Sequence, residues 1–350
     1  MSRLSSLVSL ILILAAKTIF CDSDHPQILQ RILFGSCVLQ SRPQPIFATI
    51  AEMDPDLFVF LGDNIYADTI DMTVMQRKYA ELAGSPLFQL LLESCPVLAV
   101  WDDHDYGAND AGSEYPKKDE SKRLFLDFWK EPEDSLRRKR AGIYVAHLYG
   151  PVGRRVQVIL LDTRTFRDSL VRGNPQPTDA LGPYVANPDP AATILGEQQW
   201  RWLEEQLARP ARVRIIASSI QVIPGFSGWE SWANFPFEKQ RLLDLITERE
   251  IEGVIFISGD RHFAELSVLH RGVAYPLYEL TSSALNLRHP SGLTGDNEYR
   301  IGGTYLRENF GEIQIRWGAE PLISLSIRDI QGKVRLETSF PLADLASARP

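Results

Sequence analysis

Six short runs of apolar residues recur along the chain, and each ends abruptly in polar residues or glycine. They cover residues 32–34, 57–61, 97–101, 156–161, 213–217 and 253–257. Hydrophobicity within each run is continuous rather than alternating, which is typical of strands buried on both faces of a sheet. Between them, apolar residues recur at helical spacing over residues 77–93, 196–207 and 238–250. Such an alternation of strands and helices predicts a layered α/β fold.

The last part of the chain has a different pattern. Residues 311–317, 322–327 and 333–340 alternate between apolar and polar side chains, and no helical stretch separates them. A period of two is typical of antiparallel strands. The sequence has no internal repeat and no interdomain linker, so we expect a single domain over residues 31–345. Residues 172–193 are rich in Pro, Gly, Asn and Asp and predict a long surface loop, a kind of segment that is often functional.

The first 21 residues are predicted to be a signal peptide. A short basic start precedes an apolar run over residues 4–16, which is too short to span a bilayer comfortably. Cleavage is expected after Ala16 or near Cys21. A retained N-terminal anchor is the alternative, and a lipoprotein cysteine is disfavoured because the bulky Phe20 precedes Cys21. We therefore expect a secreted or extracytoplasmic protein with no transmembrane domain beyond the signal peptide.

Composition narrows the classes of function. Of the 350 residues, 44% are hydrophobic and 23% charged, which excludes wholesale disorder, collagen and a polytopic membrane protein. Lys and Arg number 37 against 45 Asp and Glu, a net charge of −8, so the chain lacks the field of a non-specific nucleic-acid binder. The basic run 137–140 has no interleaved aromatic residues and is expected to be a solvated loop rather than a nucleic-acid patch. The oligomeric state stays open.

Residues of metal-ligand type follow four of the predicted buried strands. They are Ser-Cys at 36–37, Gly-Asp-Asn-Ile-Tyr at 62–66, Asp-Asp-His-Asp at 102–105 and Ser-Gly-Asp-Arg-His at 258–262. One such residue is ordinary turn chemistry, but ligand sites of open α/β folds lie at the carboxyl ends of strands. Ligand-type residues at the ends of four strands therefore favour a binding site. Carboxylate, imidazole, phenolate and thiolate together indicate a polynuclear centre with a hard, oxidised metal such as ferric iron beside a divalent ion, a pair that can clamp a phosphoryl group.

Five motifs resemble those of one phosphatase family. They are the strand-end Ser-Cys, Gly-Asp-x-x-Tyr at 62–66, Trp-Asp-Asp-His-Asp at 101–105, Leu-Asp-x-Arg at 161–164 and Ser-Gly-Asp-x-His at 258–262. Together they resemble the alkaline phosphatase D (PhoD-like) family of the calcineurin-like metallophosphoesterase superfamily. The resemblance implies an α/β fold, a layered α/β/β/α sandwich with mixed sheets and antiparallel C-terminal strands. Longer bacterial members begin with a β-sandwich and a twin-arginine signal, and this sequence shows neither.

The resemblance also implies a dinuclear or polynuclear metal site of ferric iron and calcium. Six residues would hold the ions: Cys37, Asp63, Tyr66, Asp103, Asp260 and His262. Asp63 would bridge two metal positions, and Cys37 and Tyr66 would bind the ferric iron. Asp103 would bind calcium, which prefers oxygen ligands. Two alternatives stay open for Cys37: a small buried hydrophobic residue, or a disulfide with Cys95 in an exported protein.

Catalytic roles follow from the same resemblance. His104 would protonate the leaving oxygen or stabilise developing charge, and Asp105 would orient His104. Asn109 would reach the metals or the phosphate. Arg164 and Arg261 would hold phosphate oxygens, although a strand-end arginine is as often a structural salt-bridge partner.

These residues imply an exported phosphoesterase in which a metal-activated hydroxide attacks a phosphate mono- or diester. The alternative is a non-catalytic exported protein of the same fold that binds phosphate or metal.

Overall fold

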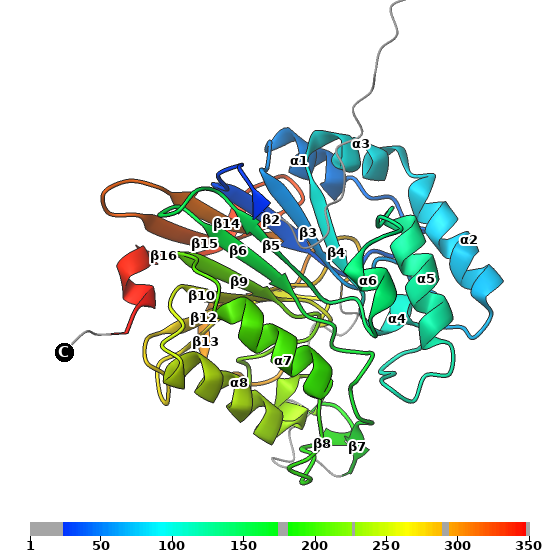
Figure 1. Cartoon of the computed structure of the whole chain (residues 1–350). Helices are drawn as coiled ribbons and strands as arrows, with labels where there is room; N and C mark the ends of the chain where they lie inside the picture. The colour runs from blue at the N-terminus through cyan, green and yellow to red at the C-terminus, as the bar shows by residue number, and fades with distance from the viewer. Residues whose placement is uncertain (1–23, 174–180, 226–227, 289–293, 348–350) are drawn as a thin grey trace, which may run out of the picture.

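Two mixed β-sheets lie face to face at the centre of the molecule, with helices on their outer faces (Figure 1). The structure is a computed structural model that describes residues 24–173, 181–225, 228–288 and 294–347. One continuous hydrophobic cluster fills the space between the sheets and beneath the helices. The predicted mixed α/β sandwich is therefore confirmed.

The larger sheet has eight strands in the described part of the chain, in the order β1-β5-β6-β9-β10-β12-β11-β13. They are β1 (Asp24–His25), β5 (Val145–Tyr149), β6 (Val156–Leu160), β9 (Val213–Ala217), β10 (Val254–Ser258), β11 (Ala264–Leu269), β12 (Leu277–Ser282) and β13 (Arg300–Tyr305). Neighbours from β6 to β12 in this order run parallel. Every residue of β6, β9 and β10 is buried, which explains their unbroken apolar runs.

The second sheet has the order β16-β15-β14-β2-β3-β4 among the described residues. Its strands are β2 (Arg31–Gly35), β3 (Leu57–Leu61), β4 (Val97–Val100), β14 (Asn309–Arg316), β15 (Leu322–Asp329) and β16 (Val334–Pro341). β2, β3 and β4 are parallel, whereas β14, β15 and β16 form an antiparallel meander that joins the sheet where Ile313 lies opposite Ile32. The antiparallel C-terminal strands are thus confirmed. The edge strand β16 alternates between more and less exposed residues, as its sequence does.

The helices lie in two groups (Figure 1). α1 (Ile46–Glu52), α2 (Met72–Ala83) and α3 (Pro86–Ser94) lie on the side of the six-stranded sheet, and α7 (Gly196–Leu207) and α8 (Pro236–Glu248) lie on the other side. The single helix predicted over residues 77–93 is wrong. Gly84 ends α2, and the Ser85 hydroxyl accepts the Phe88 N–H to begin α3, with Pro86 in its first turn.

The basic run 137–140 is a second correction. It lies in α6 (Leu136–Lys139), which follows α5 (Lys118–Phe128). Arg137 is only 4% exposed: its guanidinium lies 3.0 Å from Glu131 and donates to the carbonyls of Ala99 and Ile143. Arg138 pairs with Asp127. Part of the run is therefore a buried ion pair that holds the chain around α6, and not a solvated loop.

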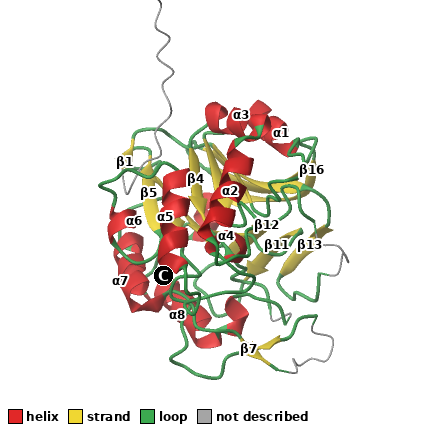
Figure 2. Cartoon of the chain, turned by 90° about the vertical axis from the view of Figure 1, so that its right-hand side faces the viewer, coloured by secondary structure: helices red, strands yellow, loops and turns green. Residues whose placement is uncertain are grey.

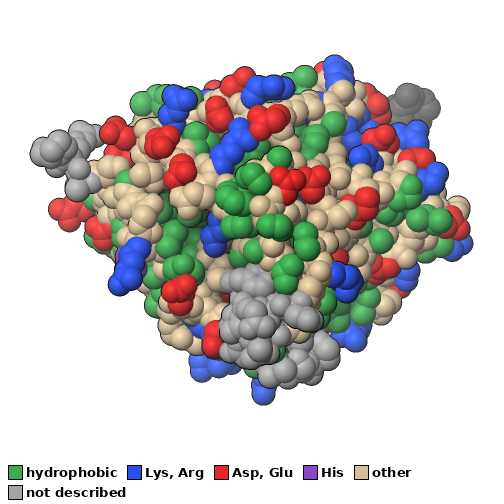
Figure 3. All heavy atoms as spheres, turned by 90° about the horizontal axis from the view of Figure 1, so that it is seen from below, with side chains coloured by type: hydrophobic (Ala, Val, Ile, Leu, Met, Phe, Trp, Pro, Cys, Tyr) green, Lys and Arg blue, Asp and Glu red, His purple; other side chains and the backbone are tan. Residues whose placement is uncertain are grey.

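Other expectations concern segments at the edges of the fold. The predicted signal peptide, residues 1–21, lies outside the described residues. Among the helices that are described, none is long and apolar enough to cross a membrane. At the start of and within the predicted loop 172–193, β7 (Val171–Arg172) pairs antiparallel with β8 (Tyr184–Val185). Basic and acidic side chains are interspersed on the face shown in Figure 3, as a modest net charge implies.

The fold brings the carboxyl ends of β2, β3, β4 and β10 together at one end of the sandwich. Backbone bonds join the segments that follow β2, β3 and β4, because Val38 N–H donates to the Asp63 carbonyl and Ala67 N–H to the His104 carbonyl. The four-residue helix α4 (Asp103–Tyr106) begins directly after β4, and Figure 2 shows it near the centre of this end of the molecule. The predicted ligands therefore converge here.

Candidate metal centre

Each predicted metal ligand lies in a turn just after a strand. Cys37 follows β2, Asp63 and Tyr66 follow β3, Asp103 begins α4 after β4, and Asp260 and His262 follow β10. Four of the six have a left-handed backbone, with φ of 64° at Cys37, 50° at Asp63, 69° at Asp260 and 59° at His262. Residues other than glycine adopt this conformation rarely, and such strain concentrates at functional sites.

Two glycines let these turns approach one another. A Cβ on Gly62, whose φ is +99°, would lie 2.4 Å from the Cβ of Asp102, so only glycine lets the ends of β3 and β4 meet. A Cβ on Gly259 would lie 2.4 Å from the Ser36 hydroxyl. Gly259 therefore lets the turn after β10 pack on the turn after β2. In both Gly-Asp pairs the glycine allows the close approach of the neighbouring turn, and the aspartate that follows supplies the candidate ligand.

The first group of donors joins three strand ends. The Tyr66 hydroxyl lies 3.0 Å from Asp63 Oδ2 and 2.9 Å from His262 Nε2, and the Cys37 sulfur lies 3.4 Å from Asp63 Oδ2. Ser283, just after β12, supports the group: its hydroxyl accepts the His262 N–H at 2.7 Å and lies 3.2 Å from the Cys37 sulfur. Cys37 is a thiol that is not bonded to Cys95. Thiol, phenol, carboxyl and imidazole are thus in one place.

Further donor groups are linked to the first, directly or through one another, by shared members. Within each of three sets the ligand atoms lie within 4.8 Å of one another: Cys37, Asp63 and His262; Asp63, Asp103 and His104; and Asp102, Asp103 and Asp260. Asp63 belongs to the first two sets and Asp103 to the last two. A side chain common to two donor groups can bridge two ions, so the geometry fits more than one metal position.

Burial raises the pKa of most of these acids, whereas at Asp103 the positive charges of Arg164 and His104 outweigh burial and lower the pKa to about 2. Burial raises the pKa of the Cys37 thiol to about 12 and that of Asp260 to about 7. Burial and the neighbouring anionic groups raise the pKa of Tyr66 well above its usual value. Burial also raises the pKa of Asp63, although the positive charge of His104 opposes the shift. A bound cation favours the ionised form of each ligand. The donor set therefore fits bound metal ions.

His104 lies beside this centre and is held by a residue that the sequence analysis missed. Its Nδ1 lies 2.8 Å from both carboxylate oxygens of Asp68, and its ring lies against Tyr66 with centroids 4.2 Å apart. Burial lowers the pKa of His104, but the carboxylates of Asp63, Asp103 and Asp68 outweigh burial and raise the pKa to about 11. Because Asp68 takes Nδ1, Nε2 is the nitrogen left for a substrate.

The contacts of Asp105 differ from those expected of a residue that orients His104. This carboxylate accepts backbone N–H groups of Asp102 at 2.6 Å and of Asp63 and Asn64 at 3.2 Å, and it also accepts the side chain of Asn64. It is fully buried. Asp105 therefore holds the left-handed turn that carries Asp63, whereas the carboxylate beside the His104 ring is that of Asp68.

A cavity of ≈140 Å³ opens over the centre. It is lined by Asp103, His104, Asn109, Asp110, Trp229, Glu230, Asp260, Arg261 and His262. Asn109 is exposed at its rim, and Arg261 lies with its guanidinium 5.7 Å from the centroid of Phe263. Asn109 and Arg261, both predicted substrate contacts, thus reach the cavity. Asp110, Trp229 and Glu230 were not predicted.

Arg164 forms structural salt bridges, which was the alternative expected for a strand-end arginine. Its side chain is 0% exposed and forms ion pairs with Asp102 and, at 2.7 Å, with Glu230. Arg167 also binds Glu230, at 2.9 Å. Arg164 does not line the cavity but lies behind it, where it holds two carboxylates in place.

Of the site residues that the sequence analysis missed, only Asp68 could have been proposed from its position in the sequence. It lies five positions after Asp63 in the same turn and has φ of 44°. Glu230 lies in an irregular segment between β9 and α8, and its burial depends on two arginines near residue 165. Nothing local in the sequence predicts that pairing.

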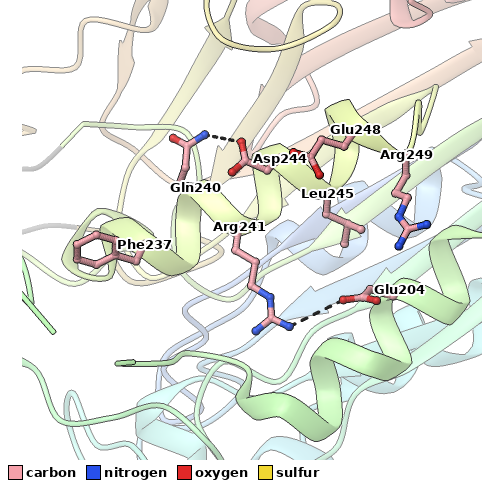
Figure 4. A pocket seen from close by; sticks show the side chains of 8 residues that line it. All are labelled: Glu204, Phe237, Gln240, Arg241, Asp244, Leu245, Glu248 and Arg249. Atoms are coloured by element: carbon pink, nitrogen blue, oxygen red, sulfur yellow. Dashed lines mark hydrogen bonds and ion pairs between the residues drawn. The ribbon is translucent and has the colours of Figure 1, made fainter. Parts of the chain in front are cut away.

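A larger groove of ≈470 Å³ lies elsewhere, between α7 and α8 (Figure 4). Its Arg241 lies 3.8 Å from Glu204 and also pairs with Glu197, and Gln240 donates to Asp244. The charge of Arg241 is thus neutralised by acids beside it. None of the predicted ligands lines it, so the smaller cavity remains the candidate site.

Solved structures of other proteins share the fold of this chain. A dimetal phosphatase from Danio rerio has a TM-score of 0.52 at 12% identity, over 90% of this chain and all of that chain. GAP50, described as the anchor in the inner membrane complex of Plasmodium, has a TM-score of 0.55 at 11% identity, over 92% of this chain and 90% of that one. The fold is of the metallophosphoesterase type.

More specific comparisons identify the family. Residues 74–298, well over half of the chain, match the model of the PhoD-like phosphatases. A solved structure of PhoD has a TM-score of 0.68 at 16% identity, over 94% of this chain and 73% of that chain. Alkaline phosphatase D of Bacillus subtilis (strain 168) is 24% identical over 258 residues, which are 63% of this chain but 41% of that protein. The chain belongs to the PhoD-like phosphatase family, and membership supports a phosphoesterase function.

Proposed function

We propose that this protein is an exported, metal-dependent phosphoesterase that hydrolyses phosphate mono- or diesters. Its catalytic part would be a single domain over residues 31–345, and residues 1–21 would direct export. The observation that supports the proposal is the convergence of donors from four strand ends on one centre. A cavity lined by Asp103, His104, Asp260 and His262 lies beside these donors. A turn-stabilising role for these residues would not need thiol, phenol, imidazole and carboxyl groups in the same place.

The proposed metal ligands divide between two kinds of ion. Cys37, Tyr66 and His262 would hold ferric iron, and Asp103 and Asp260 would hold calcium, with Asp63 shared between them. When bound, the cations would supply Lewis acidity toward the phosphoryl oxygens and lower the pKa of water at the site.

The remaining residues handle the substrate. His104 donates a proton from Nε2 to the oxygen of the departing alcohol, while Asp68 holds the opposite nitrogen. Arg261 and Asn109 line the same cavity and contact the non-bridging phosphate oxygens. Arg164 acts from behind by holding Glu230 and Asp102.

The experiment combines metal analysis with hydrolysis. We expect the purified protein to contain iron and calcium and to hydrolyse a nitrophenyl phosphate monoester or the matching bis-ester, and chelation should abolish turnover. Asp63→Asn should lose at least one ion and keep less than about a tenth of turnover, a barrier increase above ~1.4 kcal/mol. Asp127→Asn, at an exposed ion pair with Arg138, is the control and should change neither quantity.

Three outcomes would contradict this proposal. Turnover that survives chelation would refute metal dependence, and zinc alone would refute the assigned ions. Bound metal without turnover of either ester would favour the non-catalytic binding protein.

A further inference from the structure

One wall of the candidate cavity differs chemically from the rest. Of the nine residues that line it, eight are charged or polar, and Trp229 is the exception. Its side chain is half-buried, so part of the indole is left open beside groups that would contact a phosphate. An aromatic ring kept open at a polar cavity loses hydrophobic stabilisation unless a ligand covers it.

The position of Trp229 is fixed from two sides. A Cβ on Gly182 would lie 2.7 Å from Trp229 Cδ2 and 2.1 Å from the Gly228 carbonyl oxygen, so the segment before β8 packs tightly against the indole. Tyr184 N–H donates to the same Gly228 carbonyl at 3.0 Å. On the other side, Glu230 is bound by two buried arginines.

The β8 segment is in turn fastened to the cavity. The Tyr184 hydroxyl donates to Asp110 Oδ2, and Asp110 N–H donates to Asp103 Oδ2 at 2.6 Å. The indole is therefore held in a fixed relation to a proposed metal ligand. Little conformational freedom is lost when a ligand packs against such a ring, which makes it an effective contact surface.

We propose that Trp229 is a specificity residue that packs against the alcohol part of the substrate, so that the enzyme prefers phosphate esters of aromatic alcohols. This inference rests on the proposed function. His104 and Trp229 line the same small cavity, so an ester whose leaving oxygen reaches His104 has its alcohol group beside the indole. A planar ring gains stacking there that an aliphatic group does not.

The test compares two monoesters whose alcohols have similar acidity, so that the chemistry of departure is matched: phenyl phosphate and hexafluoroisopropyl phosphate. Trp229→Leu should lower the ratio of kcat/KM for the phenyl ester over the fluoroalkyl ester by about 2- to 12-fold, the range for an aromatic pair. Trp229→Phe should keep most of the preference. Trp317→Phe is the control, because Trp317 lies after β14 and donates to the Leu29 carbonyl, and it should leave the ratio unchanged.

A second measurement does not depend on turnover. Calorimetric binding of phenylphosphonate and methylphosphonate to the metal-loaded protein should show that Trp229→Leu weakens only the phenyl compound, by a similar factor. An equal loss for both ligands, or for both esters, would overturn the proposal and assign Trp229 a structural role. If the wild-type protein hydrolyses neither these monoesters nor a nitrophenyl bis-ester, the proposed function fails, yet the phosphonate pair still decides whether the indole binds rings.

Discussion

Replacing Asp68 tests whether it acts through His104. Asp68→Asn keeps a similar shape and a residue type that tolerates the left-handed φ of 44°, but it removes the charge that faces Nδ1. A charge-assisted hydrogen bond contributes roughly 1.5–3 kcal/mol and a neutral one roughly 0.5–1.5 kcal/mol. The Asp68 side chain is 43% exposed, so solvent screens the difference and about 1 kcal/mol remains. This corresponds to about a 5-fold loss of rate.

The assay uses leaving groups to separate positioning from general damage. A general acid matters most when the leaving alcohol is a poor one, so Asp68→Asn should slow an alkyl phosphate about 5-fold and a nitrophenyl phosphate less than about 2-fold. His104→Asn should retain bound metal and slow the alkyl ester by roughly 10²–10⁴-fold. In the His104→Asn background, Asp68→Asn should have almost no further effect, because its partner is gone.

The matched control is Asp71→Asn, three positions along the chain. Asp71 is an exposed residue that caps α2 by accepting the Thr73 N–H and does not touch His104. Because asparagine caps a helix about as well as aspartate, this substitution should cost little helix stability and leave the leaving-group dependence unchanged. Two results would show that Asp68 does not act through His104. One is an equal loss of rate for both esters in Asp68→Asn, and the other is the same loss from Asp68→Asn in the His104→Asn background as in the wild-type protein.

Two further predictions concern other buried residues. Cys37 is 0% exposed and should react with thiol reagents only after the metal is removed. The Cys37→Ser variant should lose iron before it loses stability. A Cys37–Cys95 disulfide found by mass spectrometry in active protein would contradict the assignment of Cys37 as a metal ligand. His147 in β5 is 1% exposed, and burial lowers the pKa of its imidazole from 6.5 to about 3. Between these two pH values the unfolded state binds a proton that the folded state does not, so the free energy of unfolding decreases as the pH falls. His147→Leu should therefore gain about 1–2 kcal/mol of unfolding free energy relative to wild type between pH 7 and pH 5. Denaturant titrations at both pH values measure this, and parallel pH profiles would contradict it.

The parts of the fold that could be predicted are those whose local pattern matches their burial. β6, β9 and β10 are fully buried strands, and their sequences are unbroken apolar runs. β11 and β12 were missed because buried glutamates interrupt the pattern. Glu265 is bound by Gln221 at 2.7 Å and Arg300 at 2.6 Å, and Glu279 accepts the Ser258 hydroxyl at 2.6 Å. Partners so far away in the sequence make these carboxylates compatible with the core, and no local signal predicts them.

The candidate site divides in the same way. Residues that follow buried strands could be assigned to one site, because topology alone brings the ends of parallel strands together. The roles of Asp105 and Asp68 could not be separated, since both are acids within a few residues of a ligand. The difference is one of direction: Asp105 points at the backbone of Asp63 and Asn64, whereas Asp68 points at the His104 ring. Side-chain direction depends on the left-handed turns, which the sequence does not specify.

Those turns connect folding to chemistry. A non-glycine residue in the left-handed region costs of order 1–3 kcal/mol, and Cys37, Asp63 and Asp260 are also buried acids whose pKa is raised. The chain retains this arrangement because other groups fix it, such as Asp105 on the Asp63 turn and Ser283 on the His262 N–H. The ligands are therefore held in position at a cost to stability, and a bound cation offsets that cost by favouring their ionised forms. Metal affinity and the stability of this end of the sandwich are thus thermodynamically linked.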